Sequence, residues 1–352
     1  MPRHHRIRVP EMPPSDYVAR LIDDATSEEK KEKYNILTFA THERYQTLMA
    51  KTGHNFYGFL TEGIKEWNED YGEMPDNFYP LPKETLYRGI KFDFILAQSK
   101  FGQFQIAELI NQKLNLPIIS LEHTAPTSVL KQEWLDEIKN MAGDINVFIS
   151  EWSKKQWKIN SFNQQIVHHA VDVDLFRPLD IDRNPVILTV ANDFKNRDYC
   201  LNYSGWERIT EGLDTKVVGS SPDGFSEPAP SVEKLVEDYA SAQVYLNTTT
   251  VSPIPTSLLE AMACGCAVVT TATCMIPEVV KHGVNGMISN DESELRGYIE
   301  ELLSNEELRK ELGENARKTV VENFSEHTFL QSWERIFKEA YEMKNNNFYK
   351  EG

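Results

Sequence analysis

The chain has 352 residues and a mass of 40.5 kDa, which predicts two domains of ordinary size or one large domain. Its composition, 40% hydrophobic and 26% charged, fits a soluble globular protein and excludes collagen-like, fully disordered and disulfide-scaffold classes. The formal net charge of −17 at pH 7 argues against bulk attraction to DNA or to anionic membranes, although it leaves room for a local basic groove.

The sequence carries no signal for secretion or membrane insertion. No run of about 18 apolar residues could form a transmembrane helix, and the basic N-terminus lacks the apolar segment of a secretory signal. The cysteines are few for this length and form no paired ligand motif; they are Cys200, Cys264, Cys266 and Cys274. We therefore expect a cytoplasmic protein with reduced thiols.

In the first half, a polar, proline-containing arm precedes short apolar runs that alternate with segments of helical spacing, such as residues 104–114. The predicted strands are residues 34–40, 92–97, 117–121 and 146–150. Strands that alternate with helices predict βαβ units and a parallel sheet.

The second half repeats this pattern, with strand starts spaced by about one βα unit. Its predicted strands are residues 186–191, 215–219, 244–247, 267–271 and 287–289. Helices then extend to about residue 342 and are interrupted at Phe324-Ser325, where Ser325 is a candidate N-cap.

Together these elements predict two Rossmann-like α/β domains in series that face a cleft. The expected parts are an arm at residues 1–33, a first domain at 34–170, a linker at 171–184, a second domain at 185–324 and a final helix at 325–352. Ligands of open parallel sheets bind at the carboxyl ends of the strands, so the cleft could serve two substrates.

Residues 236–290 are the most informative segment. A loop at 248–255 leads from a strand into a helix predicted at 258–264, with Thr256 and Ser257 as N-caps. The free amides and the dipole at the start of that helix predict an anion site. Gly265 ends the helix, and Pro277 opens a short helix at 278–281 after the next strand.

In order and spacing, this segment resembles the nucleotide-sugar site of the GT-B glycosyltransferases of the GT4-like retaining group (glycosyl transferases group 1). The shared features include the turn Ala261-Met262-Ala263-Cys264-Gly265 and the helix Pro277-Glu278-Val279-Val280. The resemblance implies retaining, metal-independent sugar transfer from a nucleoside-diphosphate sugar, UDP-linked, to a hydroxyl. It implies no cofactor beyond the donor, and a final helix that crosses back to the first domain.

The resemblance also assigns donor-binding positions. Glu260 matches the second glutamate of the family's E-x7-E motif, whose carboxylate accepts hydrogen bonds from the ribose hydroxyls. The first glutamate, which holds the donor sugar in the family, is replaced by Ser252. Thr256, Ser257 and Leu259 complete the expected donor site around Glu260.

A diphosphate leaving group needs positive charge nearby. The family's arginine after the first strand of the second domain falls at Asn192 in this chain. Lys195 and Arg197 are the remaining cations, so both are predicted to act in catalysis on the diphosphate. The alternative interpretation is that both are solvated surface charges.

In the first domain, His123 at the end of a strand resembles the family histidine that lies near the donor sugar, and Glu122 could orient it. A hydrogen-bonded core histidine is the alternative. The polar residues that follow other predicted strands are acceptor-side or phosphate-contact candidates. They are His42, Glu43, Arg44 and Lys100.

Two kinds of acceptor are compatible with the sequence. One is a small molecule, lipid head group or saccharide, and the other is a nucleic-acid base that bears a hydroxyl. A basic, aromatic surface that could bind DNA would contain Lys30, Lys31, Lys33, Lys51, Lys154, Lys155, Lys158, Trp152 and Trp157. Asp172 and Asp174 resemble the family's linker rather than a metal-binding D-x-D motif, so we expect no metal. A non-catalytic sugar-nucleotide-binding protein is the rival function, because Ser252 and Asn192 replace two expected polar contacts.

Overall fold

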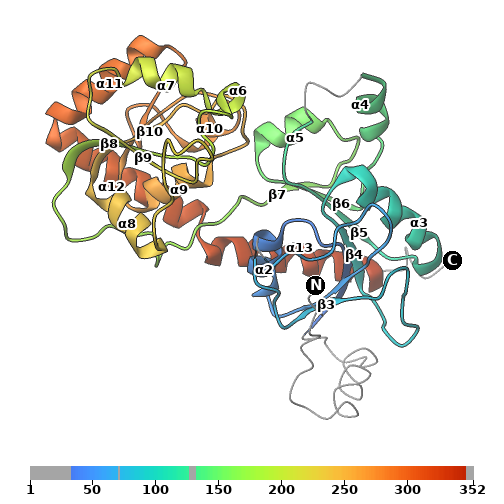
Figure 1. Cartoon of the computed structure of the whole chain (residues 1–352). Helices are drawn as coiled ribbons and strands as arrows, with labels where there is room; N and C mark the ends of the chain where they lie inside the picture. The colour runs from blue at the N-terminus through green and yellow to red at the C-terminus, as the bar shows by residue number, and fades with distance from the viewer. Residues whose placement is uncertain (1–32, 70–71, 127–131, 346–352) are drawn as a thin grey trace.

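Two parallel sheets covered by helices form two α/β domains in the computed structural model, which describes residues 33–69, 72–126 and 132–345 (Figure 1). Within these residues, the first sheet has seven strands in the order β3-β2-β1-β4-β5-β6-β7, and the second has five in the order β12-β11-β10-β8-β9. Every neighbouring pair of named strands is parallel. The predicted fold class is therefore confirmed, while the predicted arm, apart from Lys33, lies outside the described residues.

In the first domain, alternate residues of each central strand enter opposite layers of the core. Ile36 and Leu96 pack with α2 and α13, whereas Leu37 and Ile95 pack with α3. Burial on both faces is typical of a parallel sheet. The strands are β1 (Asn35–Thr38), β2 (Asn55–Gly58), β3 (Phe78–Pro80), β4 (Phe94–Ala97), β5 (Ile118–Glu122), β6 (Ile145–Phe148) and β7 (Gln164–Ile166). The helices are α2 (Glu43–Ala50), η1 (Lys100–Phe104), α3 (Gln105–Leu114), α4 (Gln132–Ile138) and α5 (Glu151–Trp157).

The second domain has the same layered construction, and side-chain caps define its helix starts. Asp291 accepts hydrogen bonds from Ser293 N and Glu294 N at the start of α11, and Asn305 caps α12. The strands are β8 (Asn184–Val190), β9 (Thr215–Val218), β10 (Ala242–Asn247), β11 (Ala267–Thr270) and β12 (Met287–Ile288). The helices are α6 (Asp198–Leu201), α7 (Tyr203–Ile209), α8 (Val232–Ser241), α9 (Thr256–Ala263), α10 (Ile276–Val279), α11 (Glu292–Ser304), α12 (Glu306–Asn323) and α13 (Glu326–Asn345).

The chain passes between the domains twice, and the two crossings lie side by side. Val171 N donates to Phe324 O at 2.8 Å, and Val171 forms a parallel bridge with Ser325. After the second crossing, α13 runs across the first domain (Figure 1), where Trp333 and Phe337 join its core. Ser325 accepts a hydrogen bond from Thr328 N, as expected of the predicted N-cap.

All nine predicted strands are present, but the described residues also contain three short strands that were not predicted. β2 (Asn-Phe-Tyr-Gly), β3 (Phe-Tyr-Pro) and β7 (Gln-Gln-Ile) contain glycine, proline or polar residues, so they lack the apolar runs of the central strands. The helical region after residue 292 also has a second break, at Asn305.

Candidate functional site

An open cleft of about 820 Å³ lies at the carboxyl ends of β8 and β10, in front of the first turn of α9. The second domain supplies most of its wall, including the loop at residues 248–255. Among the described residues, Arg44 at the start of α2 is the lining residue that comes from the first domain. Strands that end at one sheet edge thus place a cavity where ligands of such folds bind.

Glu260 lines this cleft, and one of its oxygens is held by the protein. Tyr239 Oη donates to Glu260 Oε2 at 2.8 Å. Burial raises the pKa of Glu260, while the Tyr239 hydrogen bond and the charge of Arg44 lower it. No described protein group hydrogen-bonds Oε1, so that oxygen is available to accept from ligand hydroxyls. Tyr239 was not predicted, because it stands 21 residues before Glu260 with no local pattern that links them.

The helix α9 begins two residues earlier than predicted, at Thr256, and Pro255 occupies the N-cap position without a side-chain cap. Thr256 and Ser257 are therefore not caps. The Ser257 hydroxyl accepts from Tyr245 Oη at 2.9 Å, and the backbone amides of Thr256 and Ser257 donate to no described protein group. Both residues line the cleft, so the first turn presents free amides to it.

Of the two predicted cations, Arg197 lines the cleft and Lys195 does not. Arg197 is exposed, and its guanidinium has no hydrogen-bond or ion-pair partner in the described part of the chain. The Lys195 ammonium instead lies over the rings of Phe225 and Tyr203, at 4.2 and 5.4 Å from their centroids. The structure thus favours Arg197 as the cation that meets a ligand.

Asn192, at the position of the family arginine, also lines the cleft and accepts a hydrogen bond from Ser220 N at 2.9 Å. Ser252 lines the cleft as well. Leu259 was predicted to bind the donor, but its side chain is fully buried in the core of the second domain and lies outside the cleft wall. That prediction is wrong, because α9 turns Leu259 toward the core and Glu260 toward the cleft.

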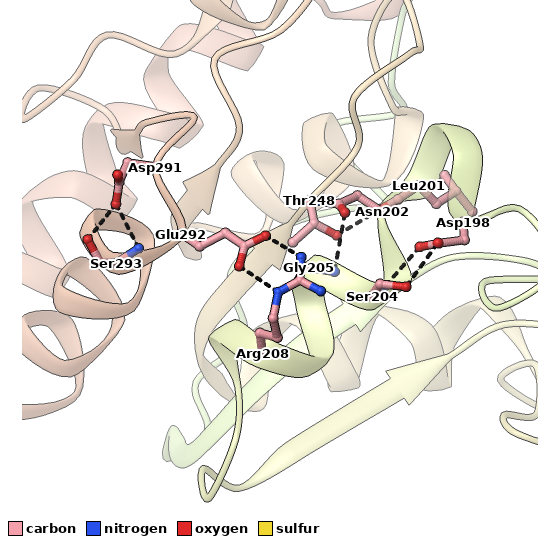
Figure 2. A network of polar contacts seen from close by, with 10 residues as sticks. All are labelled: Asp198, Leu201, Asn202, Ser204, Gly205, Arg208, Thr248, Asp291, Glu292 and Ser293. Carbon is pink, nitrogen blue, oxygen red and sulfur yellow. Dashed lines mark hydrogen bonds and ion pairs between the residues drawn. The ribbon is translucent and has the colours of Figure 1, made fainter.

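Polar contacts at the corner between α6 and α7 connect it to Thr248, which lines the cleft (Figure 2). Asp198 accepts from both the backbone N and the hydroxyl of Ser204, and Thr248 Oγ1 donates to Leu201 O at 2.8 Å. An ion pair between Arg208 and Glu292 ties α7 to α11. Arg197 directly precedes α6, so the same corner fixes the backbone that carries it.

His123 follows β5 in a cluster of aromatic side chains. It is 7% exposed and lies outside the cleft lining; its Nε2 is 3.2 Å from Gln98 Oε1, and its ring centroid is 4.1 Å from that of His42 and 4.6 Å from that of Tyr45. Burial, followed by the nearby His42 and His169, holds the pKa of His123 well below its ordinary value. Burial therefore favours the neutral imidazole, and the buried Nδ1 of His123 has no hydrogen-bond partner among the described residues.

The acceptor-side candidates occupy different environments. Arg44 is exposed and lines the cleft, and His42 is exposed at the N-cap position of α2, where its ring contacts that of His123 at a tilt of 56°. Glu43 is buried and accepts from Asn68 N at 3.2 Å, away from the cleft lining. Only Arg44, of these three, is therefore brought to the cleft.

The Lys100 prediction is wrong, because its side chain is 1% exposed. Its ammonium donates to Ser120 Oγ at 2.6 Å and to the Met141 carbonyl. Burial lowers the pKa of Lys100 and raises that of Glu122, while the Lys100 charge offsets part of the rise in Glu122. Lys100 and Glu122 thus influence each other electrostatically inside the first domain, while the hydrogen bonds of the Lys100 ammonium go to other groups.

In the described part of the chain, several members of the predicted basic, aromatic surface are buried or paired within the protein, so they are not available to bind DNA. Trp157 is buried, and Trp152 packs against the core of the second domain. Lys51 pairs with Glu326 and Lys154 with Glu151. Lys30 and Lys31 lie outside the described residues.

Asp172 caps a turn by accepting from the backbone N of Asp174 and of Leu175. Across the described residues, no group of three His, Cys, Asp or Glu side chains is arranged to hold a metal ion. Nor does any helix among them have the length and apolar composition needed to span a membrane.

Comparisons with known proteins agree with this geometry. Residues 228–319, which include most of the cleft wall, match the family model of the glycosyl transferases group 1. The chain is 33% identical to the uncharacterized glycosyltransferase MJ1069 of Methanocaldococcus jannaschii, over 87% of this chain and 90% of that protein.

Two solved structures show the same fold at low sequence identity. The sucrose-phosphate synthase of Thermosynechococcus elongatus has a TM-score of 0.67 and 14% identity, covering 88% of this chain and 100% of that one. Anabaena Alr3699/HepE in complex with UDP-glucose has a TM-score of 0.64 and 15% identity, covering 87% and 99%.

Proposed function

Because the chain belongs to the glycosyl transferases group 1 and is a glycosyltransferase with the GT-B fold, we propose that it moves a sugar from a UDP-linked donor to an acceptor hydroxyl with retention at the anomeric carbon. The UDP and UDP-glucose complexes of HepE support this choice of donor. We propose no cofactor other than the donor itself.

The observation that carries the proposal is the placement of Glu260 in the same cleft as the free amides of α9 and the guanidinium of Arg197. Glu260 Oε1 would accept from the ribose hydroxyls, while Tyr239 holds Oε2. The amides of Thr256 and Ser257 would bind the diphosphate, since the start of a helix favours an anion. Arg197 would balance the charge that develops as the diphosphate leaves.

Arg44 would add positive charge from the opposite domain. It faces the same cleft, and its charge already acts on Glu260. Two arginines and two amides around one diphosphate favour a reaction that needs no metal ion. If transfer by the chain were lost in EDTA and restored by Mg²⁺, this part of the proposal would be wrong.

His123 would contact the donor sugar through its free Nδ1. The ring of His42 lies against it in a tilted contact, so a sugar that reaches His123 would have to displace His42 or pack beside it. Ser252, in place of the family glutamate, would offer a hydroxyl to the same sugar.

For the acceptor, we favour the hydroxyl of a small molecule, lipid head group or saccharide over a hydroxylated nucleic-acid base. A second groove of about 200 Å³ shares Arg44 with the cleft and is also lined by Thr47, Lys51 and Glu326, which suits a small polar group. The burial of Trp157 and the ion pairs of Lys51 and Lys154 argue against the candidate DNA-binding surface. Retention of the chain on DNA at low salt, lost as salt rises, would reverse this order of preference.

The test is a thermal-shift panel of nucleotide sugars, followed by mass spectrometry of acceptor mixtures and NMR of the product's anomeric configuration. A donor that binds the folded chain raises its melting temperature. Transfer with retention supports the proposal, and inversion would contradict the retaining assignment. Donor binding without hydrolysis or transfer would instead support the rival function, a non-catalytic sugar-nucleotide-binding protein.

A further inference from the structure

A direct contact between the two domains is made by Glu278, in α10 of the second domain. Its Oε2 accepts from Glu151 N at 3.0 Å, and its Oε1 accepts from Trp152 N, both in the first turn of α5 in the first domain. Figure 1 shows α5 and α10 on facing sides of the two domains. The Trp152 side chain also packs against the core of the second domain, so an apolar contact accompanies the polar one.

On the side of the second domain, α10 is connected to the loop at residues 248–255 that lines the donor cleft. Thr273 Oγ1 donates to Thr249 O at 2.8 Å, and Met275 N donates to Pro253 O at 3.2 Å. These bonds lie on either side of Ser252, which is part of the cleft wall. A shift of this loop on donor binding would therefore be carried to α10 and Glu278.

On the side of the first domain, α5 holds the segment that carries His123. Ser153 Oγ and Trp157 Nε1 each donate to Thr124 O at 2.8 Å. Thr124 directly follows His123 in the chain. The orientation of α5 therefore fixes the backbone next to the predicted sugar-contacting histidine.

We propose that Glu278 is a positioning residue, which sets the position of the donor loop relative to the His123 segment across the domain interface. The path runs from the loop at 249–253 through α10 and Glu278 to α5 and Thr124. Both carboxylate oxygens are used on backbone amides, and charge-assisted bonds of this kind fix geometry as well as adding stability. The catalytic consequence rests on the proposed glycosyl transfer, whereas the structural consequence does not.

The structural consequence can be measured without any substrate. Small-angle scattering of Glu278→Ala is expected to show a broader distribution of distances between the domains than the wild-type chain. The matched control is Glu311→Ala, which removes an exposed glutamate from α12. An unchanged scattering profile for Glu278→Ala would overturn the proposal, whatever the chain's activity.

A second variant removes a donor rather than the acceptor. Glu151 is the first residue of α5, where proline is tolerated, and Ser150 before it has extended dihedral angles of −164° and 165° that proline also permits. Glu151→Pro deletes the N–H that binds Glu278, while Glu151→Ala keeps that N–H and loses the same side chain. The proposal predicts that Glu151→Pro, but not Glu151→Ala, reproduces the scattering change of Glu278→Ala.

In transfer assays, Glu278→Ala and Glu151→Pro should each lower kcat by about 10- to 100-fold, because small misplacements of reacting groups have effects of this size. Donor affinity measured by calorimetry should change less than about twofold, since no contact to the donor is removed. The two changes combined should cost little more than either alone, as expected for partners in one contact. A variant that lost donor affinity and melting temperature along with kcat would have a general folding defect, which would overturn the proposal. So would a double variant whose loss of kcat equals the product of the two single losses. If the wild-type chain neither binds nor transfers any sugar nucleotide, the proposed function fails while the scattering result still stands.

Discussion

The hydroxyl of Tyr239, at the end of α8, donates to Glu260 Oε2 in the middle of α9 and so fixes the carboxylate that faces the cleft. Tyr239 is fully buried, and its position is set by the packing of α8 against β10 and α9. The two oxygens of this carboxylate therefore have different roles: the protein holds Oε2, and Oε1 is left to accept from a ligand.

Glu260→Ala should weaken donor binding by about 10- to 100-fold, because hydrogen bonds to a charged group contribute about 1.5–3 kcal/mol. Calorimetry with UDP and with UDP-sugars measures the change, and Glu311→Ala is the control for loss of a surface glutamate. An affinity equal to that of the wild type would show that Glu260 does not hold the nucleotide.

Donor binding should also depend on the ionisation of Glu260, because only the carboxylate accepts from both ribose hydroxyls. Burial raises its pKa, and both Tyr239 and Arg44 lower it. Affinity should therefore fall as the pH drops through this pKa, and Tyr239→Phe or Arg44→Gln should move the fall to higher pH. Calorimetry across a pH series checks this, with Tyr298→Phe as a control remote from the cleft. If Tyr239→Phe left the pH dependence of donor affinity unchanged, the role assigned to the Tyr239–Glu260 hydrogen bond would be contradicted.

The cations should separate into one that acts on the ligand and one that supports the fold. Arg197→Gln should lower kcat/KM by at least about tenfold, because it removes charge from the diphosphate site. Lys195→Gln should leave kcat/KM nearly unchanged and should reduce the free energy of unfolding by about 0.5–1 kcal/mol, the usual value of an exposed cation–π contact. Steady-state kinetics and urea titration of both variants test this, and the reverse pattern would restore Lys195 as the catalytic cation.

Strand positions were predictable wherever an apolar run marked a strand buried on both faces, as in β10 and β11. Short polar strands such as β7 carry no such mark, because their pairing depends on a neighbour already in place. Motif spacing located Glu260, whereas the errors at Leu259 and Lys100 arose because sequence spacing does not show which way a side chain points. The partners Tyr239 and His169 come from distant segments, so only the packed structure brings them to the site.

The buried ammonium of Lys100 gives a prediction for stability. Lys100→Met should reduce the free energy of unfolding by about 1–3 kcal/mol, because it leaves the Ser120 hydroxyl and the Met141 carbonyl without their hydrogen-bond partner. The double variant Lys100→Met/Ser120→Ala should recover part of this loss, since it removes one of the unpaired groups as well. Urea unfolding measures both. If Lys100→Met instead kept full stability and lost transfer activity, Lys100 would be a ligand contact after all.

The return of α13 to the first domain has a consequence for how the chain folds during synthesis. The apolar layer under β1 and β4 is completed by Trp333, Ile336 and Phe337, which leave the ribosome after the entire second domain. Domains generally fold in the order in which they are synthesised, so the first domain must wait with an exposed apolar face while the second one matures. A fragment that stops before residue 326 would lack this layer and should aggregate, even though every strand of both sheets is present.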